Sequence, residues 1–227
     1  MEIFNNIPVS LEPDKVLQFM HVRSNSPQVE GLVQELIEVV RPIAKPKAVY
    51  KVSYVDAKDG DTVTIDGIRF TSRVLRINLD HVERVFPYVT TCGTEVEEIS
   101  VPSDDFMKSF CLDAVKTVVL RSAIAYLSDH LKKYYALGEM SHMNPGSLES
   151  WPVSQQRELF SLFGNVEELI GVRLTEGCMM IPMKSVSGIH FPTEVRFESC
   201  QLCPREKCFG RKAPYDPELA KKYREET

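Results

Sequence analysis

Hydrophobic residues recur at three- and four-residue steps in several parts of the chain, which is the spacing that buries one face of an α-helix. The clearest case begins at Ser26, a favourable N-cap residue, continues through Pro27 and stops before Pro42. The same spacing predicts further helices at Glu12–Val22, Val74–Val85, Asp104–Leu137, Ser154–Phe163 and Pro217–Arg224. For the longest helix we expect Ser103 as the cap. Its expected buried stripe consists of Phe106, Phe110, Ala114, Thr117 or Val118, and Ile124.

Other segments alternate between apolar and polar residues, which is the period of a half-buried β-strand. A strand is predicted at Ala48–Tyr54, and a hairpin is predicted around Asp66-Gly67, because these two residues accept the positive φ angles of a two-residue turn. Shorter strands are expected at Tyr88–Cys92, Val172–Leu174, Met179–Ile181 and Ser185–Phe191. Helices and strands alternate irregularly and form no chain of βαβ units. The predicted class is therefore α+β with a mainly antiparallel sheet.

The composition is that of a soluble globular protein, since 43% of the 227 residues are hydrophobic and 26% are charged. This length fits one large domain with an appendage better than two full-sized domains. From residue 198 onward the sequence becomes polar and rich in cysteine. We therefore expect an α+β domain at residues 1–197 and a C-terminal metal-binding tail at residues 198–227.

The net charge of −5 argues against nucleic acid as a partner, because nucleic-acid-binding proteins usually carry a basic surface. The N-terminal residues lack the basic start and apolar run of a signal peptide, and no apolar stretch is long enough to span a membrane. The expected location is the cytoplasm, without membrane attachment. In that compartment thiols stay reduced, so clustered cysteines bind metal more often than they form disulfides.

The tail contains three of the 6 cysteines within nine residues: Cys200, Cys203 and Cys208. Two residues between the first pair allow both sulfurs to reach one ion, and basic residues around the cluster favour thiolates. An iron–sulfur cluster is the first expectation and structural zinc the second, with redox-active thiols or inert cysteines as further alternatives. Cys178 is the first candidate for a fourth ligand. Weaker candidates are Cys92, Cys111 and His190, and the two cysteines among them are expected in the core.

The segment from Asn144 to Ile189 contains several short motifs in a characteristic order. They are Pro145-Gly146, Trp151-Pro152, Gln155 or Gln156, Leu159-Phe160, Ile170-Gly171-Val172, Leu174-Thr175 and the run Met179–Ile189. Together they resemble the C-terminal activation domain of cobalamin-dependent methionine synthase, and more closely the small stand-alone proteins of that family.

This resemblance implies a twisted, mainly antiparallel sheet flanked by helices. In the family the domain binds S-adenosylmethionine and docks over a corrinoid, so that inactive cob(II)alamin is reduced and then remethylated. The implied task of the protein is to position reactants rather than to supply acid–base chemistry. The implied partner is a corrinoid-binding protein or methyltransferase, with cobalamin held by that partner.

The chain departs from the family pattern at the ligand-binding loop. The family has an arginine four residues before the glycine of the Pro-Gly pair and a tyrosine directly after that glycine. Here these positions hold His142 and Ser147, while Pro145 and Gly146 are retained. The arginine would pair with the carboxylate of S-adenosylmethionine, and a histidine that is mostly neutral at pH 7 replaces it poorly. The cofactor is therefore a doubtful ligand on sequence grounds.

Three more residues are candidates for contact with a cofactor. Lys184 and Ser185 follow a predicted buried strand and could bind a phosphate or carboxylate, although a solvated turn explains them equally well. Trp151, the only tryptophan, could pack on a planar ligand, whereas the alternative is that it seals the edge of the core.

The leading hypothesis is a corrinoid-associated protein that assists reductive activation or methyl transfer, with a cysteine-ligated metal site in its tail. If the protein is an enzyme, it is a methyltransferase-related reactivation component of the methionine synthase type. The alternative is a zinc-stabilised scaffold that binds a corrinoid protein or another partner without catalysis.

Overall fold

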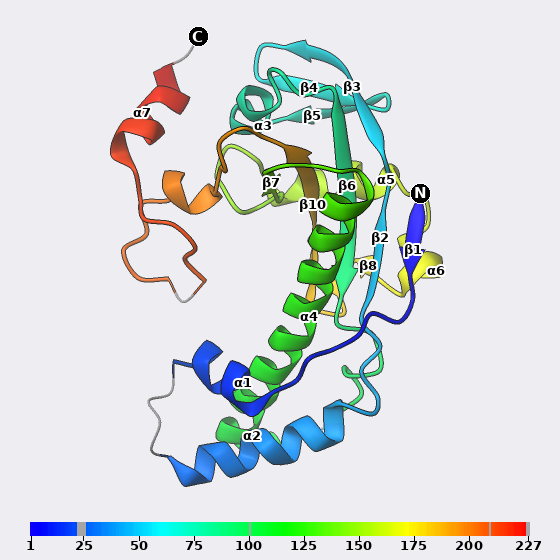
Figure 1. Cartoon of the computed structure of the whole chain (residues 1–227), viewed down its shortest axis with the longest axis vertical. Helices are drawn as coiled ribbons and strands as arrows, with labels where there is room; N and C mark the ends of the chain where they lie inside the picture. Colours follow the sequence, from blue (N-terminus) through cyan, green and yellow to red (C-terminus); the bar gives the residue numbers. More distant parts are fainter. Residues whose placement is uncertain (22–25, 100, 209, 226–227) are drawn as a thin grey trace.

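The computed structural model describes residues 1–21, 26–99, 101–208 and 210–225, and a branched antiparallel sheet lies at its centre (Figure 1). Strand β6 (Arg84–Thr91) pairs with β2 (Lys47–Tyr50) and β3 (Ser53–Asp59) along one edge and with β10 (Ser185–Pro192) along the other. The sheet is extended by β1 (Glu2–Phe4) beyond β2 and by β7 (Met140–Met143) beyond β10. β3 continues into a meander with β4 (Thr62–Ile65) and β5 (Ile68–Thr71).

The alternation of side chains along β6 builds a different core on each face of the sheet. Phe86 and Tyr88 face the long helix α4 (Phe106–Tyr134), whose Ala123, Leu127 and Leu131 cover them. Val85 and Val89 point the other way, into a cluster with α3 (Arg73–Asn78), α5 (Gln156–Ser161), α6 (Val166–Ile170) and the β4–β5 hairpin. The structure is therefore α+β with a mainly antiparallel sheet flanked by helices, as the sequence predicts.

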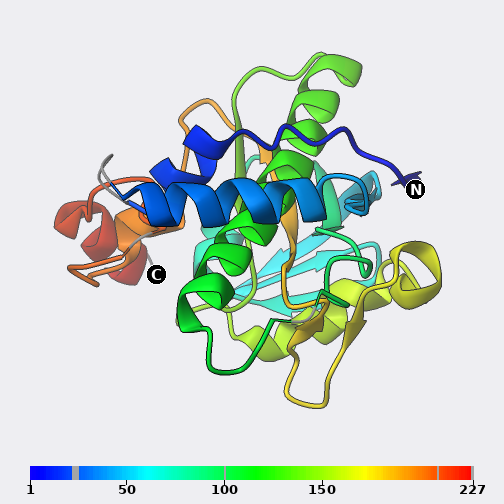
Figure 2. The same cartoon turned by 90° about the horizontal axis from the view of Figure 1, so that it is seen from below.

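A further hydrophobic cluster lies beyond the sheet. Helices α1 (Pro13–Phe19) and α2 (Pro27–Val40) pack on the N-terminal half of α4, and Figure 2 shows α2 crossing α4. Cys92 and Cys111 are fully buried in this cluster. Burial raises the pKa of the Cys92 thiol to about 12, which keeps it protonated. Both residues are core cysteines, as expected.

Most predicted elements are present, with differences mainly at their ends. The predicted strand Ala48–Tyr54 is divided into β2 and β3, but both parts keep one register on β6, through Tyr50 opposite Tyr88 and Ser53 opposite Val85. The turn at Asp66-Gly67 has the expected positive φ angles of 47° and 78°. The predicted strands after residue 171 correspond to β8 (Arg173–Leu174), β9 (Met180–Ile181) and β10.

Two predictions about helices are wrong and a third is wrong in part. The helix expected at Val74–Val85 ends at Asn78, because the chain continues into β6, which is longer than the strand predicted at Tyr88–Cys92. In α4 the cap is Asp105, whose side chain accepts from the Lys108 amide, in place of Ser103. The buried stripe is as expected only in part, since Ala114 and Val118 are buried. Phe106 and Phe110, by contrast, are 80% and 56% exposed. The buried residues of α4 are Cys111, Leu112, Ala114, Val115, Val118, Val119, Ala123, Leu127 and Leu131.

The described part of the tail packs against α3. A 3-10 helix, η2 (Ser199–Leu202), leads into a loop and then into α7 (Pro217–Glu225). The Tyr223 hydroxyl donates to the Asn78 side chain, and its carbonyl accepts from Arg73 Nε. Ala220 is buried, and the Tyr223 ring packs on Phe197 with 5.7 Å between the ring centroids. The tail is thus attached to the α+β domain at both ends of its loop.

Among the described helices, none has the length and apolar character needed to cross a membrane.

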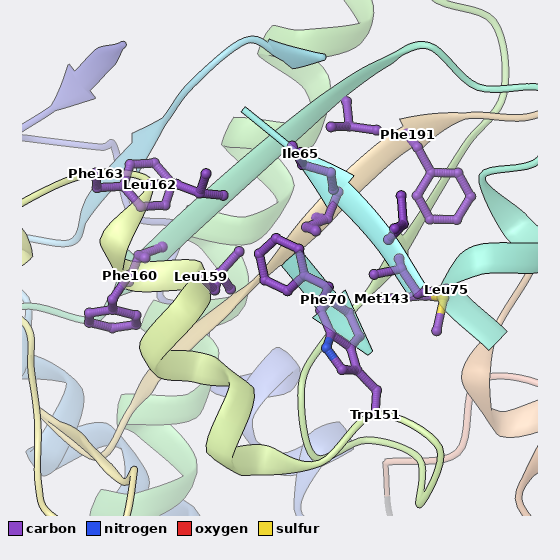
Figure 3. Close-up of a cluster of buried hydrophobic side chains, with 14 of the residues drawn as sticks. Ile65, Phe70, Leu75, Met143, Trp151, Leu159, Phe160, Leu162, Phe163 and Phe191 are labelled. Carbon is purple, nitrogen blue, oxygen red and sulfur yellow. The ribbon is translucent and has the colours of Figure 1, made fainter. Parts of the chain in front are cut away.

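Trp151 lies inside the core cluster that faces α5 (Figure 3). Its side chain is fully buried, and its ring meets the Phe70 ring edge to face at 6.2 Å. The indole Nε1 donates to Gln155 Oε1, which satisfies its only polar atom. This placement leaves no face of the indole for a ligand and fits the alternative in which Trp151 seals the core.

We expect Trp151→Ala to lower the free energy of unfolding by about 3–5 kcal/mol, since a large buried ring leaves a cavity. Urea denaturation measures this loss. Trp151→Phe should cost clearly less, because most of the contact with Phe70 is kept. A loss below about 1 kcal/mol for the alanine variant would contradict a core role.

Candidate functional site

Two histidines face each other across strands β7 and β10. His142 and His190 are direct partners in the antiparallel register, and their ring centroids lie 5.4 Å apart. On its other side the His190 ring stacks on Tyr88 of β6, with 4.4 Å between centroids and an angle of 26°. Three neighbouring strands therefore place Tyr88, His190 and His142 side by side on the α4 face of the sheet.

The loop after β7 is held against this row of rings by Asn144. Its amide nitrogen donates to the Tyr88 hydroxyl at 2.9 Å and to the Ser187 carbonyl at 2.5 Å. This approach requires a glycine at position 188, because a Cβ there would lie 2.4 Å from Asn144 Nδ2 and 2.5 Å from the Met143 carbonyl. Gly188 is thus a strand glycine that admits a neighbouring segment.

Pro145, Gly146 and Ser147 form the turn of the loop. Gly146 has a φ of 83°, and its amide donates to the Trp151 carbonyl at 2.7 Å. The Ser147 amide donates to the Asn144 carbonyl, which closes the turn. Pro145 is buried, whereas Gly146 and Ser147 are exposed. The structure therefore places His142, Pro145, Gly146 and Ser147 in one region, which we call the β7–β10 site together with Asn144, His190 and Tyr88.

Burial keeps both imidazoles of the site neutral at pH 7. The pKa of His142 is lowered to about 4, first by burial and then by the positive charge of Lys212. The pKa of His190 is lowered to about 3 by burial, with smaller effects from His142 and Lys212. Burial also raises the pKa of Tyr88 to about 12. The three rings carry no charge of their own at neutral pH.

His190 retains an unused polar atom. The residue is 3% exposed, and its Nε2 has no hydrogen-bond partner within the described ranges. A buried ring nitrogen without a partner is costly in a folded protein and often marks a functional position.

The tail reaches the β7–β10 site through Lys212. Its Nζ lies 3.3 Å from His142 Nε2, and its backbone amide donates to Cys200 Sγ at 3.4 Å. The guanidinium of the preceding Arg211 donates to several carbonyls of the same loop, those of Cys200, Cys203, Arg205 and Ala213. The carbonyl groups of the cysteine loop therefore surround Arg211, and the next residue, Lys212, contacts the β7–β10 site.

The described residues do not form the predicted metal centre. Nowhere in them do three or more His, Cys, Asp or Glu side chains gather in a group that could hold a metal ion. Cys200 and Cys203 are partly buried and Cys208 is exposed. The carbonyls of their loop converge on the Arg211 guanidinium. This geometry gives no support to an iron–sulfur cluster or zinc bound by Cys200, Cys203, Cys208 and Cys178.

Cys178, the expected fourth ligand, belongs to a different part of the molecule. It lies in the turn between β8 and β9, which is on the opposite side from the tail in both views (Figures 1 and 2). Its thiol is buried, accepts from Arg157 Nε at 3.2 Å and lies near the Ser154 carbonyl. Cys178 is expected at the start of a strand, but it lies between two strands and has a φ of 62°.

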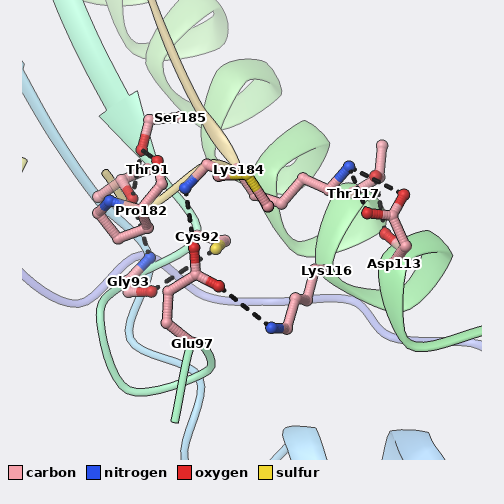
Figure 4. Close-up of polar contacts among 11 residues, drawn as sticks. Thr91, Cys92, Gly93, Glu97, Asp113, Lys116, Thr117, Pro182, Lys184 and Ser185 are labelled. Atoms are coloured by element: carbon pink, nitrogen blue, oxygen red, sulfur yellow. Dashed lines mark hydrogen bonds and ion pairs between the residues drawn. The ribbon is translucent and has the colours of Figure 1, made fainter. Parts of the chain in front are cut away.

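Lys184 and Ser185 lie at the start of β10 (Figure 4). His190 lies towards the other end of the same strand. Five residues of extended strand separate Ser185 from His190, or about 16 Å. Lys184 Nζ pairs with Asp113 of α4 at 2.8 Å, and Ser185 Oγ donates to the Pro182 carbonyl at 2.7 Å. The ion pair ties the start of β10 to α4. The structure thus separates this pair from the ligand loop.

The sequence pattern does not mark three residues of the site as ligand-site residues: Tyr88, Asn144 and Lys212. Tyr88 and Lys212 meet the loop only through tertiary contacts, and Lys212 is 70 residues from His142 in sequence. Gly188 is the sequence feature that indicates these contacts, because a glycine inside a strand often marks a place where another segment of the chain approaches closely.

We expect Gly188→Ala to destabilise the protein by about 1–3 kcal/mol, because the new methyl group overlaps Asn144 and the Met143 carbonyl. Thermal or urea unfolding measures the loss. The matched control is Gly31→Ala in α2, where a Cβ meets nothing within 4 Å and helix propensity predicts a gain of about 0.5–1 kcal/mol. Equal effects of the two substitutions would contradict the close approach at Gly188.

We also expect His142 and His190 to make the protein less stable as the pH falls below about 6.5. The unfolded chain then binds two protons that the folded site accepts only near pH 4 and pH 3. Each histidine should add up to about 1.4 kcal/mol of lost stability per pH unit in this window. Urea unfolding at pH 7, 6 and 5 measures the slope. Comparison with His142→Gln/His190→Gln removes the contribution of carboxylates, and an identical slope in this variant would contradict the prediction.

Comparisons with known proteins agree with this description. Residues 147–206 match the family model described as the activation domain of vitamin B12 dependent methionine synthase. No curated protein sequence matches the chain. A solved structure, described as the crystal structure of the MetH reactivation domain bound to AdoHcy, matches with a TM-score of 0.61 and 14% identity. The match covers 88% of this chain and 82% of the other. The chain is thus similar to the activation domain of vitamin B12-dependent methionine synthase, in sequence over residues 147–206 and in fold over most of its length.

Proposed function

We propose that this chain reactivates a corrinoid held by a partner protein, in the manner of the activation domain that it resembles. The observation that carries the proposal is the combination of the shared fold with the loop at residues 144–151, held by Asn144 and by the turn at Gly146. The partner is a corrinoid-binding protein or methyltransferase, and the place of action is the cytoplasm.

A place for a small molecule lies next to the β7–β10 site, in a cavity that none of the site residues themselves line. A cavity of about 400 Å³ lies between α3, the tail and the loop segment Leu148–Ser150, which directly follows the turn. This volume falls in the range of small-molecule sites. Its walls combine apolar side chains, such as Val74 and Leu202, with the charged Arg73 and Arg224. We propose an S-adenosyl compound as the ligand, since the solved structural match is described with AdoHcy bound.

The chemistry requires an electron and a methyl donor. S-adenosylmethionine would supply the methyl group and leave as S-adenosylhomocysteine, and the partner's corrinoid would accept the methyl group once an external reductant has supplied one electron. The protein holds the donor against the corrinoid face, which converts an encounter of separate molecules into a local reaction. Because both site imidazoles are neutral at pH 7, the proposal gives them a role in binding rather than in proton transfer.

The proposal assigns no step to the cysteine tail as a metal or electron centre. A cysteine-ligated cluster or zinc stays a sequence prediction, since the described side chains do not gather around one point. In this proposal the external reductant therefore passes its electron to the corrinoid without a metal centre of this chain in between.

The test measures corrinoid methylation. A partner loaded with cob(II)alamin is mixed with a chemical reductant and S-adenosylmethionine, and the conversion to methylcobalamin is followed by absorbance. We expect this chain to raise the rate at least tenfold, in a manner that requires S-adenosylmethionine. His142→Glu should abolish most of the gain, because a carboxylate beside Lys212 repels an anionic ligand group.

The matched control is His81→Glu, since the His81 side chain is 98% exposed and the change of charge is the same. Its rate should equal that of the unmodified chain. If the chain binds the partner without changing the methylation rate, the proposal fails and the protein is a binding scaffold instead.

A further inference from the structure

The positive charge nearest to the β7–β10 site comes from the tail and not from the sheet. His142 and His190 are neutral at pH 7, so the strands contribute two uncharged imidazoles. Lys212 places its ammonium 3.3 Å from His142 Nε2. The nearest other charges are Arg196 and Glu198, which form an ion pair with each other at 2.7 Å and largely cancel. The local balance is therefore one positive charge, from Lys212.

The position of Lys212 is fixed by its neighbours in the loop. Its own amide donates to Cys200 Sγ, and Arg211 donates to the carbonyls of Cys200, Cys203 and Ala213, on both sides of Lys212 in the chain. The backbone at residue 212 is thus held before any ligand arrives, which lowers the entropic cost of using its side chain for binding.

The ammonium of Lys212 is not neutralised within the structure. Across the described part of the chain, no carboxylate lies within 4.0 Å of its Nζ, and its side-chain contact is with a neutral imidazole. An ammonium group has three donors, and an imidazole nitrogen accepts only one of them. Two donors of the ammonium are therefore left for another acceptor beside His142. An anionic group that binds there gains a charge-assisted hydrogen bond.

We infer that Lys212 is a ligand-binding residue of the β7–β10 site and that it anchors the carboxylate of an amino-acid-like ligand. The inference rests on the proposed function for the rest of that ligand, an S-adenosyl compound. It makes the tail part of the site, with the ammonium of Lys212 over His142 in place of a charge on strand β7.

This assignment accounts for the residue at position 142. A histidine there cannot pair with a carboxylate in the way an arginine does, but its Nε2 accepts from an ammonium and so orients it. An arginine at position 142 of strand β7 should therefore restore the ligand affinity that is lost when the positive charge of Lys212 is removed.

The test compares two probes by isothermal titration calorimetry of the full chain. S-adenosylhomocysteine carries the amino-acid carboxylate, whereas 5′-methylthioadenosine has the same adenosine and sulfur but lacks it. We expect Lys212→Ala to weaken S-adenosylhomocysteine binding by about 10–100-fold and to leave 5′-methylthioadenosine binding within about twofold. Lys207→Ala, at an exposed lysine of the same loop, should leave both affinities unchanged. His142→Arg/Lys212→Ala should recover most of the lost affinity.

Three outcomes overturn the inference. One is an equal loss for both probes in Lys212→Ala, which means that the tail only supports the fold. Another is an unchanged affinity for S-adenosylhomocysteine in that variant, and the third is no saturable binding by the unmodified chain at millimolar probe. The methylation assay tests the proposed function separately. If the unmodified chain stimulates methylation but Lys212→Ala still binds S-adenosylhomocysteine normally, the proposed function stands. Only the role of Lys212 as the carboxylate anchor is then rejected.

Discussion

The pairing of β10 with β6 on one edge and with β7 on the other is the constraint on which the candidate site depends. It places Tyr88, His190 and His142 in one row across three strands. The same pairing brings the end of β7 so close to β10 that position 188 accepts only glycine. Asn144 occupies the space that a side chain would have taken, and its hydrogen bonds fix the direction of the loop. A change in the register of β7 by one residue would turn His142 to the opposite face and dismantle the site.

Electrostatics explains why the strands of the site carry neutral side chains while the tail carries the positive charge. A cation on a buried strand has to be desolvated, and the low pKa values of His142 and His190 show how strongly burial disfavours charge at this place. Lys212 avoids most of this cost, because its ammonium approaches from an exposed loop. The site thus keeps polar, uncharged rings below and one solvated positive charge above. Such an arrangement favours a ligand with an anionic end.

Much of this architecture could be predicted from the sequence, because it follows from local periodicity and turn chemistry. The helix at Pro27–Val40, the hairpin at Asp66-Gly67 and the strands after residue 171 have clear patterns, and all of them are present. The exposed Phe106 and Phe110 show the limit of that reasoning, since the direction that a long helix buries is decided by its neighbours α1 and α2. The site follows the same division. Pro145 and Gly146 were recognisable as a motif, whereas the contacts of Lys212 and Tyr88 depend on how distant segments pack.

The cysteine spacing is the case in which local pattern and tertiary structure differ most. A C-x-x-C pair followed by a third cysteine is typical of a metal site, yet the carbonyls of this loop point at the Arg211 guanidinium and one thiol receives the Lys212 amide. The loop therefore has an internal cation, the Arg211 guanidinium, to which its carbonyl groups are bound. The Arg211 guanidinium in that position holds the backbone on both sides of Lys212. Arg211, which holds the backbone of the loop, and Lys212, which supplies the positive charge beside His142, are therefore neighbours in the same short segment. Because α7 attaches the tail to α3 through Tyr223, the packing of the last helix helps to hold Lys212 beside His142.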